Sequence, residues 1–475
     1  MKIIILGAGQ VGTSVAESLV SEANDITVVD YDGERLANLQ ERLDLRVVTG
    51  NAASPSILDR AGAADADLLI AVTQSDQTNL CACRVAKTLF NVPTRIARLR
   101  AADYEDHPQL LDDTNFAVDH SICPEQIVTD YIRKLIEFPE ALQVLEFADG
   151  MVTMIAIRAF EGGLLVGKPL KTIPERLPNI DTRVAAIFRQ DQAISPTGDT
   201  VIESGDEVFL IAASTHIRRV MTELRRMDKP IRRIIIAGGG NIGLRLAKAI
   251  EKNVAVKLIE RDRRRAEQLA AELERTVVLR GDSTDEALLD AESIEETDMF
   301  LALTNDEEDN IMSASLAKQM GARRTLALIN RKSYVDLVQG GRIDIAISPA
   351  QTSIGQLLAR VRRGDVAAVH SLRRGAAEAL ELVAHGDARH CKVIGRRLEE
   401  LDLPEGATIA AIVRQTGTSR TEYRDLVPYE VPIVEVIMAH HDTVIRPDDH
   451  VIVFCTSKKL VARVEKLFQV GWGFF

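Results

Sequence analysis

Short apolar runs alternate with amphipathic helical patterns along the first quarter of the chain. Each run is three to five residues long, and the stretch that follows it repeats its apolar positions every three or four residues. Strands that alternate with helices in this way are typical of a parallel sheet with helices on both faces. The pattern therefore predicts a doubly wound α/β lobe with six strands, at Ile3–Leu6, Ile26–Val29, Arg46–Val48, Leu68–Val72, Thr94–Ala97 and Phe116–Val118.

The pattern then changes, and afterwards the whole arrangement is repeated. From about residue 141 to 227 short β-like runs predict a small α+β lobe, after which the alternation of strands and helices restarts. Gly7 and Asn79 have counterparts at Gly238 and Asn310, and the offset in numbering is the same for both pairs. We therefore predict two tandem units, each with a doubly wound lobe followed by a small lobe, with lobe boundaries at 1–138, 139–227, 228–365 and 366–475.

The second small lobe is longer than the first. Its stretch from Gln415 to Val444 corresponds to the much shorter stretch from Gln190 to Val201 in the first copy. The additional segment, roughly 416–435, contains two prolines. We expect it to form an extended surface loop.

One amphipathic helix is predicted between the first two lobes. Its apolar stripe follows a sheet that the pattern already completes. The stripe can cover the core of its own subunit or pack against a second subunit, and periodicity leaves both alternatives open. The stripe comprises Ile127, Val128, Tyr131, Ile132, Leu135 and Ile136 of the segment 124–138.

Composition and charge narrow the class of protein. With 475 residues, 46% hydrophobic and 27% charged, the chain has the composition of a soluble globular protein of about two to four domains. Its net charge of -12 argues against general nucleic-acid binding, which needs a basic face. No apolar run approaches the roughly 18 residues that cross a bilayer, so we expect any membrane role to depend on a partner.

The five cysteines are too few and too scattered for a disulfide framework, which fits a cytoplasmic compartment. Cys81 and Cys83 form a CxC on a predicted helix over Asp76–Leu89, where residues two apart face different sides. No companion CxxC or HxxxH is present. We predict that both cysteines are buried small hydrophobes and that the chain has no metal site.

Two glycine-rich turns carry the candidate chemistry. Gly7–Gly12 reads GAGQVG and Gly238–Gly243 reads GGGNIG, and each lies between an apolar strand and a helix. In this context the first glycine permits a tight turn, the second lets a phosphate approach the backbone, and the third lets the helix pack on the sheet. The free N–H groups of the helix N-terminus then face the anion. We predict dinucleotide binding by at least one turn; the alternative is a tight turn that binds nothing.

Polar side chains follow several of the predicted strands. Asp30 follows Gly12, and Glu260 follows Gly243, at close to the spacing of about 20 residues at which a carboxylate binds ribose hydroxyls. The third and fourth strands of the first lobe end at GNA and TQSDQTN, where open α/β sheets bind ligands. Capping of the next helix is nevertheless a sufficient reason for Ser75 or Asp76.

A nicotinamide-dependent oxidoreductase is the first alternative function. Such an enzyme needs an acid or base beside the nicotinamide, and the small lobes are poor in histidine and cysteine. Two complete copies also suit an assembly that closes a ring by pairing like domains better than they suit one active site. We therefore predict a protein without enzymatic activity and keep the NAD-dependent oxidoreductase as the alternative.

Several segments are specific to one family. They read MKIIILGAGQVG at the start of the chain, RIARLR at 95–100, IDTRVAAIFR at 180–189, ESGDEVFLIAAS at 203–214, VKLIERD at 256–262 and TNDEEDNIMSA at 304–314. In these segments the chain closely resembles the TrkA family, the cytoplasmic regulatory subunits of bacterial Trk potassium uptake systems. The resemblance covers nearly all the chain. It implies two tandem RCK (regulator of potassium conductance) units, each with a Rossmann-like lobe and a small C-terminal lobe.

The resemblance also implies a function. It implies a homotetrameric ring that lies under a TrkH-type membrane potassium-translocating subunit, on the inner face of the cell membrane. NAD(H) and ATP or ADP would bind the Rossmann-like lobes, and the shape of the ring would gate ion flow. A ligand can do this without being chemically changed, provided that its affinity differs between two states of the ring.

Position by position, the resemblance implies two cofactor sites and no catalytic residue. The first site would use Gly7, Ala8, Gly9, Gln10, Val11, Gly12, Asp30, Asn51, Thr73 and Arg98. The second would use Gly238, Gly239, Gly240, Asn241, Ile242, Gly243, Glu260, Asp282 and Thr304.

The two copies differ at the edge that a polyphosphate would reach. Arg98 and Arg100 correspond to Leu328 and Asn330, so we expect cations at this edge only in the first copy. The first site is therefore predicted to favour ATP or ADP more than the second; the structural alternative for Arg98 is a surface salt bridge.

The sites also differ beside the acidic residue. Asp30 precedes Tyr31 and Asp32, which favours a free ribose hydroxyl, whereas Glu260 precedes a run of arginines, Arg261 and Arg263–Arg265. NADP at the second site therefore stays open, beside the alternative of a solvated basic helix start.

Overall fold

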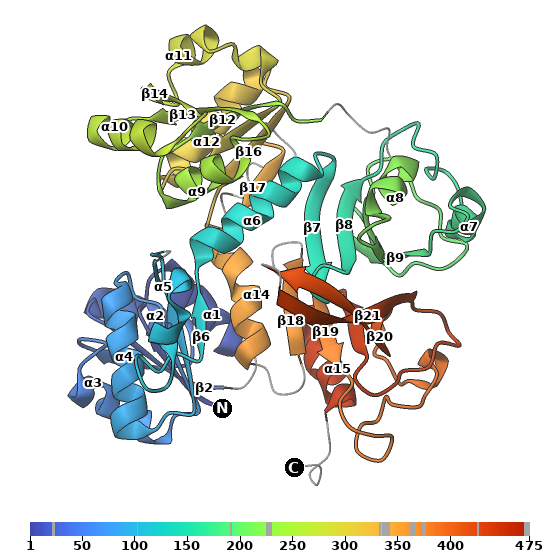
Figure 1. Cartoon of the computed structure of the whole chain (residues 1–475), viewed down its shortest axis with the longest axis horizontal. Coiled ribbons are helices and arrows are strands. Elements are labelled where there is room, and N and C mark those ends of the chain that lie inside the picture. The colour runs from blue at the N-terminus through green and yellow to red at the C-terminus, as the bar shows by residue number, and fades with distance from the viewer. Residues whose placement is uncertain are drawn as a thin grey trace. The chain divides into compact units, whose positions relative to one another are not determined.

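The computed structural model describes residues 1–20, 24–101, 103–190, 192–224, 230–331, 334, 343–361, 366–372, 377–424 and 427–469. The chain forms two compact units, each built from two separate stretches of sequence (Figure 1). Unit 1 comprises residues 1–130 and 232–357, and unit 2 comprises residues 131–231 and 358–475. The lobe boundaries drawn from the sequence stay predictions.

Unit 1 contains two six-stranded parallel sheets of the same topology. The first has the strand order β3-β2-β1-β4-β5-β6. Its strands are β1 (Lys2–Leu6), β2 (Asp25–Asp30), β3 (Arg46–Thr49), β4 (Leu68–Ala71), β5 (Thr94–Arg98) and β6 (His120–Ile122). The helices are α1 (Gln10–Val20), α2 (Gly33–Arg42), α3 (Pro55–Arg60), α4 (Asp76–Phe90), α5 (Asp103–Asp106) and α6 (Pro124–Glu137).

The second sheet has the matching order β14-β13-β12-β15-β16-β17. Its strands are β12 (Arg233–Ala237), β13 (Ala255–Glu260), β14 (Val277–Arg280), β15 (Met299–Ala302), β16 (Arg324–Leu328) and β17 (Ile345–Ile347). Its helices are α9 (Asn241–Ile250), α10 (Arg263–Glu272), α11 (Glu286–Ala291), α12 (Glu307–Gln319) and α14 (Pro349–Val361).

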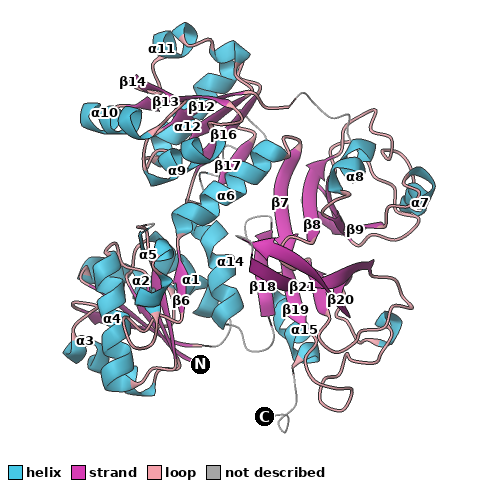
Figure 2. Ribbon diagram, in the orientation of Figure 1, coloured by secondary structure: helices cyan, strands magenta, loops and turns pink. Residues whose placement is uncertain are grey.

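The central strands explain why these sheets form. Four residues of β1 and all four of β4 are buried, as are all of β15, because helices cover both faces of a parallel sheet (Figure 2). The predicted doubly wound α/β lobes are therefore confirmed. The helix predicted over Asp76–Leu89 is α4, and on it Cys83 is buried while Cys81 is exposed. The prediction that both cysteines are buried is wrong, since residues two apart on a helix face different sides.

The sixth strand of the first sheet lies later in the chain than the sequence pattern predicts. It is formed by His120–Ile122, where it pairs with β5, and not by Phe116–Val118. Ala117 has a φ of +55°, a left-handed conformation that interrupts an extended strand. The amide of Val118 donates to the Leu111 carbonyl, so these apolar residues belong to a turn.

Unit 2 contains two five-stranded antiparallel sheets. Their strand orders are β10-β9-β11-β8-β7 and β18-β19-β22-β20-β21. The first consists of β7 (Ala141–Phe147), β8 (Val152–Arg158), β9 (Thr182–Arg189), β10 (Gln192–Ile194) and β11 (Glu207–Ala213), with α7 (Ile173–Arg176) and α8 (Ile217–Leu224). The second consists of β18 (Val366–Leu372), β19 (Ala377–Val383), β20 (Ala407–Arg424), β21 (Val427–Met438) and β22 (His450–Cys455), with α15 (Val461–Phe468).

One apolar cluster contains residues of both of these sheets. Among its members, the ring centroids of Phe188 and Phe209 lie 5.7 Å apart, and those of Phe209 and Phe454 lie 5.6 Å apart. Aromatic pairs at this separation stabilise a core beyond their area burial. The two small lobes are thus held together by a shared core.

The insert near 416–435 is not a loop. Its residues extend β20 and β21 into a long antiparallel hairpin, in which Ser419 pairs with Pro432 and Tyr423 with Pro428. Proline lacks an N–H group, so in a sheet it is confined mainly to edge strands, and β21 is an edge strand. The two prolines that favoured a loop in the sequence are therefore compatible with a strand.

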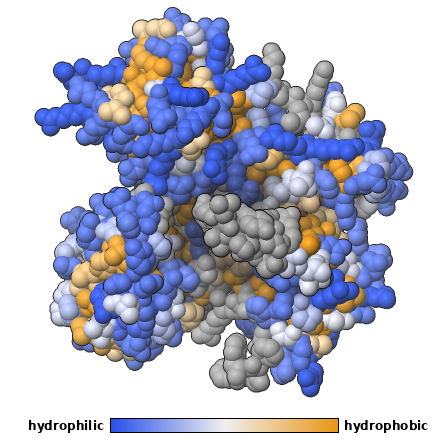
Figure 3. Space-filling model, viewed as in Figure 1, coloured by the Kyte–Doolittle hydropathy of each residue, from blue (hydrophilic) through white to orange (hydrophobic). Residues whose placement is uncertain are grey.

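The predicted helix after the first sheet is α6. Within this single chain Val128, Ile132 and Leu135 are fully buried, whereas the other three residues of the apolar stripe are only partly buried, so both alternatives for the stripe stay open. In the part of the chain that is described, no helix is long and apolar enough to cross a membrane. Hydrophilic residues cover much of the face shown in Figure 3, and apolar residues form separate patches on it.

A histidine–carboxylate pair joins β22 to β19 in unit 2. His450 Nδ1 lies 2.5 Å from Glu381 Oε1, and Glu381 Oε2 accepts a hydrogen bond of 2.8 Å from the Ala148 amide. The hydrogen bond to Glu381 raises the pKa of His450 against the opposing effect of burial, and the charges of Asp149 and Asp448 add to the increase.

We expect Glu381→Gln to lower the pKa of His450, because the substitution removes the charge that stabilises the imidazolium. Because the pKa of His450 is higher in the folded than in the unfolded state, its pair with Glu381 stabilises the fold. This contribution is fully present below the ordinary histidine value of about 6.5 and is lost as the pH rises through the folded-state pKa. NMR titration of the histidine ring protons measures the shift. An unchanged pKa in Glu381→Gln would contradict the assigned cause.

Candidate nucleotide sites

The first and third glycines of each turn are required by the chain itself. Gly7 has a φ of +109°, and a Cβ on Gly12 would lie 1.9 Å from the Gly7 carbonyl oxygen. The second copy repeats this geometry, with a φ of +106° at Gly238 and 2.0 Å from a Cβ on Gly243 to the Gly238 oxygen. Each helix therefore packs directly against the turn that precedes it.

The second glycine of each turn faces open space. Among the described residues, nothing lies within 4 Å of a Cβ built on Gly9 or on Gly240. Packing within the chain thus gives no reason for a glycine here, whereas a phosphate that approaches the backbone does.

The other positions of the turns are not equivalent. Ala8 has a side chain, but a Cβ on Gly239 would lie 2.2 Å from Leu269 Cδ1. The remaining members of the predicted set, Gln10, Val11, Asn241 and Ile242, form the first residues of α1 and α9.

The two acidic residues hold the glycine turns. Asp30 Oδ2 accepts a hydrogen bond of 2.6 Å from the Ala8 amide, and Glu260 Oε2 accepts one of 2.9 Å from the Gly239 amide. The other oxygen of each carboxylate accepts from the amide two residues later in the chain. A carboxylate has about four acceptor positions, so each acid still has capacity for a ribose hydroxyl.

A threonine–asparagine pair follows β4 in the first lobe and β15 in the second. The sequence analysis assigned only the threonine of each pair to the nucleotide site. Thr73 Oγ1 lies 2.7 Å from Asn79 Oδ1, and Asn79 Nδ2 donates to the Arg98 carbonyl at 2.9 Å. Thr304 and Asn310 repeat the arrangement, with the Leu328 carbonyl as acceptor at 3.0 Å. The signal that could have identified the asparagines is that they occupy equivalent positions of the repeat.

Polar residues also follow the third strand of each sheet. Asn51 Oδ1 accepts from the Ala53 amide at 2.9 Å, and Asp282 Oδ1 accepts from the Thr284 amide at 2.9 Å. The hydrogen bond from the Thr284 amide is the main cause of the lowered pKa of Asp282. Both side chains therefore stabilise local turns in the structure, and their contact with a ligand stays a prediction.

Of the two polar residues Ser75 and Asp76 that follow β4, helix capping explains only Ser75. The Ser75 hydroxyl caps α4 by accepting from the Thr78 amide at 3.1 Å, as the structural alternative requires. Asp76 instead binds the amides of Arg100 and Ala101, at 2.9 and 3.0 Å. It therefore fixes the segment that follows β5.

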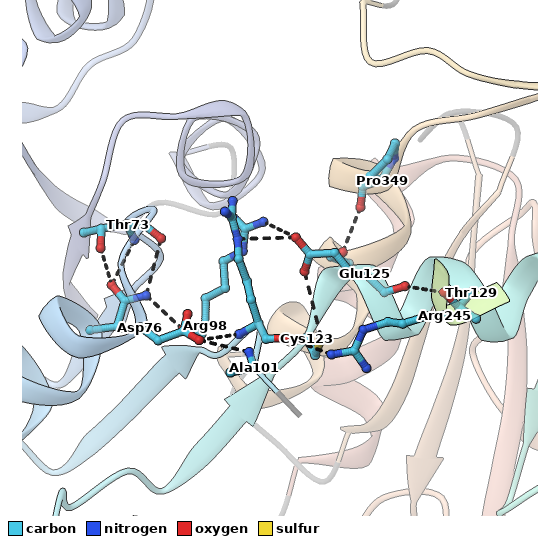
Figure 4. A network of polar contacts seen from close by, with 12 residues as sticks. Thr73, Asp76, Arg98, Ala101, Cys123, Glu125, Thr129, Arg245 and Pro349 are labelled. Atoms are coloured by element: carbon cyan, nitrogen blue, oxygen red, sulfur yellow. Dashed lines mark hydrogen bonds and ion pairs between the residues drawn. The ribbon is translucent and has the colours of Figure 1, made fainter. Parts of the chain in front are cut away.

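The arginines at the edge of the first site converge on one carboxylate (Figure 4). Arg98 Nη2 donates to Glu125 Oε1 at 2.8 Å, and Arg100 Nε lies 3.3 Å from the same oxygen. The Arg98 and Glu125 side chains are each only 12% exposed, so Arg98 forms a largely buried ion pair and not a surface salt bridge. Burial lowers the pKa of Arg98, and the charge of Glu125 opposes this.

This edge has unused hydrogen-bonding capacity. The Nε atom of Arg98 is buried and has no hydrogen-bond partner among the described residues, and Arg100 Nε contacts Glu125 only as an ion pair, without the geometry of a hydrogen bond. Two arginines also share one carboxylate, which leaves an excess of positive charge. The composition of the edge fits an anionic ligand, and phosphate contact by Arg98 stays a prediction.

The corresponding edge of the second site has a different cation. Asn79 donates to the Arg98 carbonyl and Asn310 donates to the Leu328 carbonyl, so Arg98 and Leu328 occupy equivalent positions, as the sequence predicted. However, the comparison of the copies missed the nearby cation Arg331. Its Nη1 lies 3.0 Å from Glu308 Oε1 and 2.6 Å from the Tyr334 hydroxyl. Because Arg331 is exposed and already paired with Glu308, the expectation that a polyphosphate finds cations at this edge only in the first copy stays a prediction.

The arginines after Glu260 make structural contacts at the N-terminus of α10. Arg265 Nε donates to the Gly239 carbonyl at 2.8 Å, and Arg263 pairs with Glu267 one helical turn later. Both contacts support the structural alternative for this basic run.

Two Rossmann-type lobes with duplicated glycine turns, joined to two small antiparallel lobes, define the class of tandem RCK proteins. The TrkA-N domain model matches residues 3–124 and 234–349, and the TrkA-C domain model matches residues 154–225. The crystal structure of the GsuK RCK domain shares the fold, with a TM-score of 0.61 and 18% identity over 98% of this chain and 94% of that one. The GsuK channel bound to NAD has a TM-score of 0.60 and 16% identity, over 98% of this chain and 78% of that one.

Sequence similarity is far higher to the potassium uptake proteins. The chain is 55% identical to the Trk system potassium uptake protein TrkA of Vibrio alginolyticus over 99% of both chains. It is 54% identical to that of Halomonas elongata over the whole of both chains, and 48% identical to that of Haemophilus influenzae over 99% of both. The chain belongs to the TrkA family.

Proposed function

We propose that the chain is a peripheral regulatory subunit of a Trk-type potassium uptake system, which binds NAD(H) and ATP or ADP and gates a membrane subunit. Membership of the TrkA family supports the assignment to potassium uptake. The observation that carries nucleotide binding is the open space at Gly9 and Gly240 within turns whose other glycines are required by packing.

Each glycine turn is proposed to hold one nucleotide. The backbone at Gly9 or Gly240 and the first N–H groups of α1 or α9 would bind the phosphates, and Asp30 or Glu260 would bind a ribose. Thr73, Asn51 and Arg98 complete the first site, and Thr304 and Asp282 complete the second. The ligand is bound and released unchanged.

The assembly is proposed to be a homotetrameric ring on the cytoplasmic face of the cell membrane, attached to a TrkH-type potassium-translocating subunit. Two similar halves in one chain allow like lobes to pair within and between subunits, which closes a ring. Ligand binding would gate ion flow by favouring one of two ring states, to the extent that its affinity for them differs.

The proposal is tested by nucleotide binding and by potassium uptake. Calorimetry of the full-length protein should detect binding of NADH, ATP and ADP. Expression in cells that lack their own regulatory subunit should restore potassium uptake, and Gly9→Val together with Gly240→Val should abolish this. Absence of nucleotide binding would overturn the proposal, and NADH oxidation that depends on Asp30 would favour the oxidoreductase instead.

We expect ATP to bind the first site at least about fivefold more tightly than the second, because an additional charge-assisted hydrogen bond contributes roughly 1 kcal/mol or more. The full-length variants Gly240→Val and Gly9→Val each leave one turn available, so they form a matched pair. Calorimetric titration with ATP measures the residual site in each. Equal ATP affinities would contradict the predicted difference between the sites.

A further inference from the structure

Arg245 connects the helix of the second glycine turn to the cation edge of the first site. Its Nη1 donates to Gln126 Oε1 at 2.9 Å. Its Nη2 donates to the Arg100 carbonyl at 2.7 Å, and Figure 4 shows Arg245 within this network of polar contacts. All three residues belong to unit 1. The two bonds use both terminal nitrogens of the guanidinium, a fork geometry that lysine cannot reproduce.

At one end, Arg245 is fixed to the second turn. It lies in α9, two residues after Gly243, and Gly243 packs directly on the Gly238 carbonyl. An α-helix moves as a rigid element over so short a distance, because each of its residues is tied to the next turn by backbone hydrogen bonds. A displacement of this turn by a ligand would therefore also displace the Arg245 guanidinium.

At the other end, Arg245 contacts the supports of the first site. The Arg100 amide is held by Asp76, and Arg100 Nε lies beside Glu125. Gln126 directly follows Glu125 in α6, and Glu125 is the partner of Arg98. The contacts of Arg245 thus lie within two residues of both members of the buried Arg98–Glu125 pair.

The first copy has no arginine at the position of Arg245. At the constant offset of the repeat, the residue that corresponds to Arg245 in the first copy is Ser14. A serine hydroxyl is too short to span the distance that the arginine side chain spans. Ser14 therefore cannot form the reciprocal bridge from α1 to the edge of the second site.

We propose that Arg245 is a positioning residue that transmits ligand binding at the second glycine turn to the arginine edge of the first site. This inference rests on the proposed function, since it requires a nucleotide at the second turn. The coupling is reciprocal, so a polyphosphate that repositions Arg98 and Arg100 also changes affinity at the second turn.

Hydrogen exchange of the full-length protein tests the inference, with NADH as the probe. In the Gly9→Val variant NADH can bind only at the second turn, and the amides of Arg100 and Ala101 report on the first site. We expect NADH to change their exchange rates by about fivefold or more, within the usual range of coupling between sites. Adding Arg245→Met should reduce this response to within about twofold of no change.

Two further variants keep the result interpretable. Lys248→Met removes a charge from the same helix, where Lys248 pairs with Glu272 at 2.9 Å, and should leave the response intact. Arg245→Lys keeps the charge but loses the fork, and should behave as Arg245→Met does. If calorimetry shows no NADH binding to Gly9→Val, nucleotide binding at the second turn fails, and this inference with it. If NADH binds and the response persists without Arg245, only the coupling by Arg245 is overturned.

Discussion

Gly12→Ala is expected to destabilise the first Rossmann-type lobe and to abolish nucleotide binding at its turn. The new Cβ would lie 1.9 Å from the Gly7 carbonyl oxygen, and Gly7 is held in place because its amide donates to the Val29 carbonyl at 2.7 Å. Helix α1 would have to separate from the turn, at a cost of about 1–3 kcal/mol or more. Thermal unfolding followed by calorimetry measures the shift, with the first lobe followed separately because a multi-lobe chain need not unfold in one step.

Gly9→Ala is the matched control for this substitution. It adds the same methyl group to the same turn, but among the described residues nothing lies within 4 Å of the new Cβ. We expect the thermal midpoint to stay unchanged while NADH affinity falls, because the methyl group occupies the space that a phosphate needs. Gly243→Ala and Gly240→Ala repeat the comparison in the second lobe. Equal effects of the two substitutions on stability would contradict the assignment of separate roles to the two glycines.

The parts of the fold that the sequence predicted are those that local pattern determines. Continuous apolar runs such as Ile3–Leu6 identify strands that are buried on both faces, and a glycine turn between strand and helix is encoded within one short motif. The duplicated lobes and both turns could therefore be located without coordinates.

The parts that the sequence missed depend on distant partners. The hairpin of β20 and β21 is defined by pairing with each other, which outweighs the local turn signal of Pro428 and Pro432. The three-residue strand β6 is too short to stand out beside the apolar turn at Ala117. Short strands of this kind are recognisable only from their pairing with a neighbour.

The same limit applies to the candidate sites. The acids Asp30 and Glu260 were located by their spacing from the turns. In contrast, the partner of Arg98 is Glu125, 27 residues away, and the contacts of Arg245 lie 119 and 145 residues away. The spacing within one motif therefore suffices to predict candidate ligand contacts, whereas the partners that hold these side chains in place are set by the tertiary fold.

Each small lobe contains the same buried ion pair. Arg414 Nε and Nη2 bind the two carboxylate oxygens of Asp449 at 2.8 and 2.7 Å, and Arg189 binds Asp206 at 2.9 Å through the same two nitrogens. Asp449 and Asp206 are 0% and 1% exposed. Burial alone would raise the pKa of Asp206, but its hydrogen bonds, chiefly that with Arg189, outweigh burial and lower it. The stability that this pair contributes is therefore present above the unfolded-state pKa and is lost as the pH falls through the lower folded-state pKa.

Asp449→Ala is expected to lower the free energy of unfolding of unit 2 by about 3–5 kcal/mol, because it leaves a largely buried guanidinium without its counter-charge. The Arg446 amide, which donates to Asp449 Oδ2 at 2.7 Å, loses its acceptor as well. Asp206→Ala should have a smaller effect, since the Arg189 side chain is 31% exposed and that of Arg414 only 14%. Asp199→Ala is the control, because it breaks an exposed ion pair in which the Asp199 side chain is 85% exposed and that of Lys171 is 65% exposed. Its effect on the free energy of unfolding should be close to the error of the measurement. Urea unfolding of the three variants and the unsubstituted protein gives the order, and an Asp449→Ala effect no larger than that of Asp199→Ala would contradict a structural role for the buried pair.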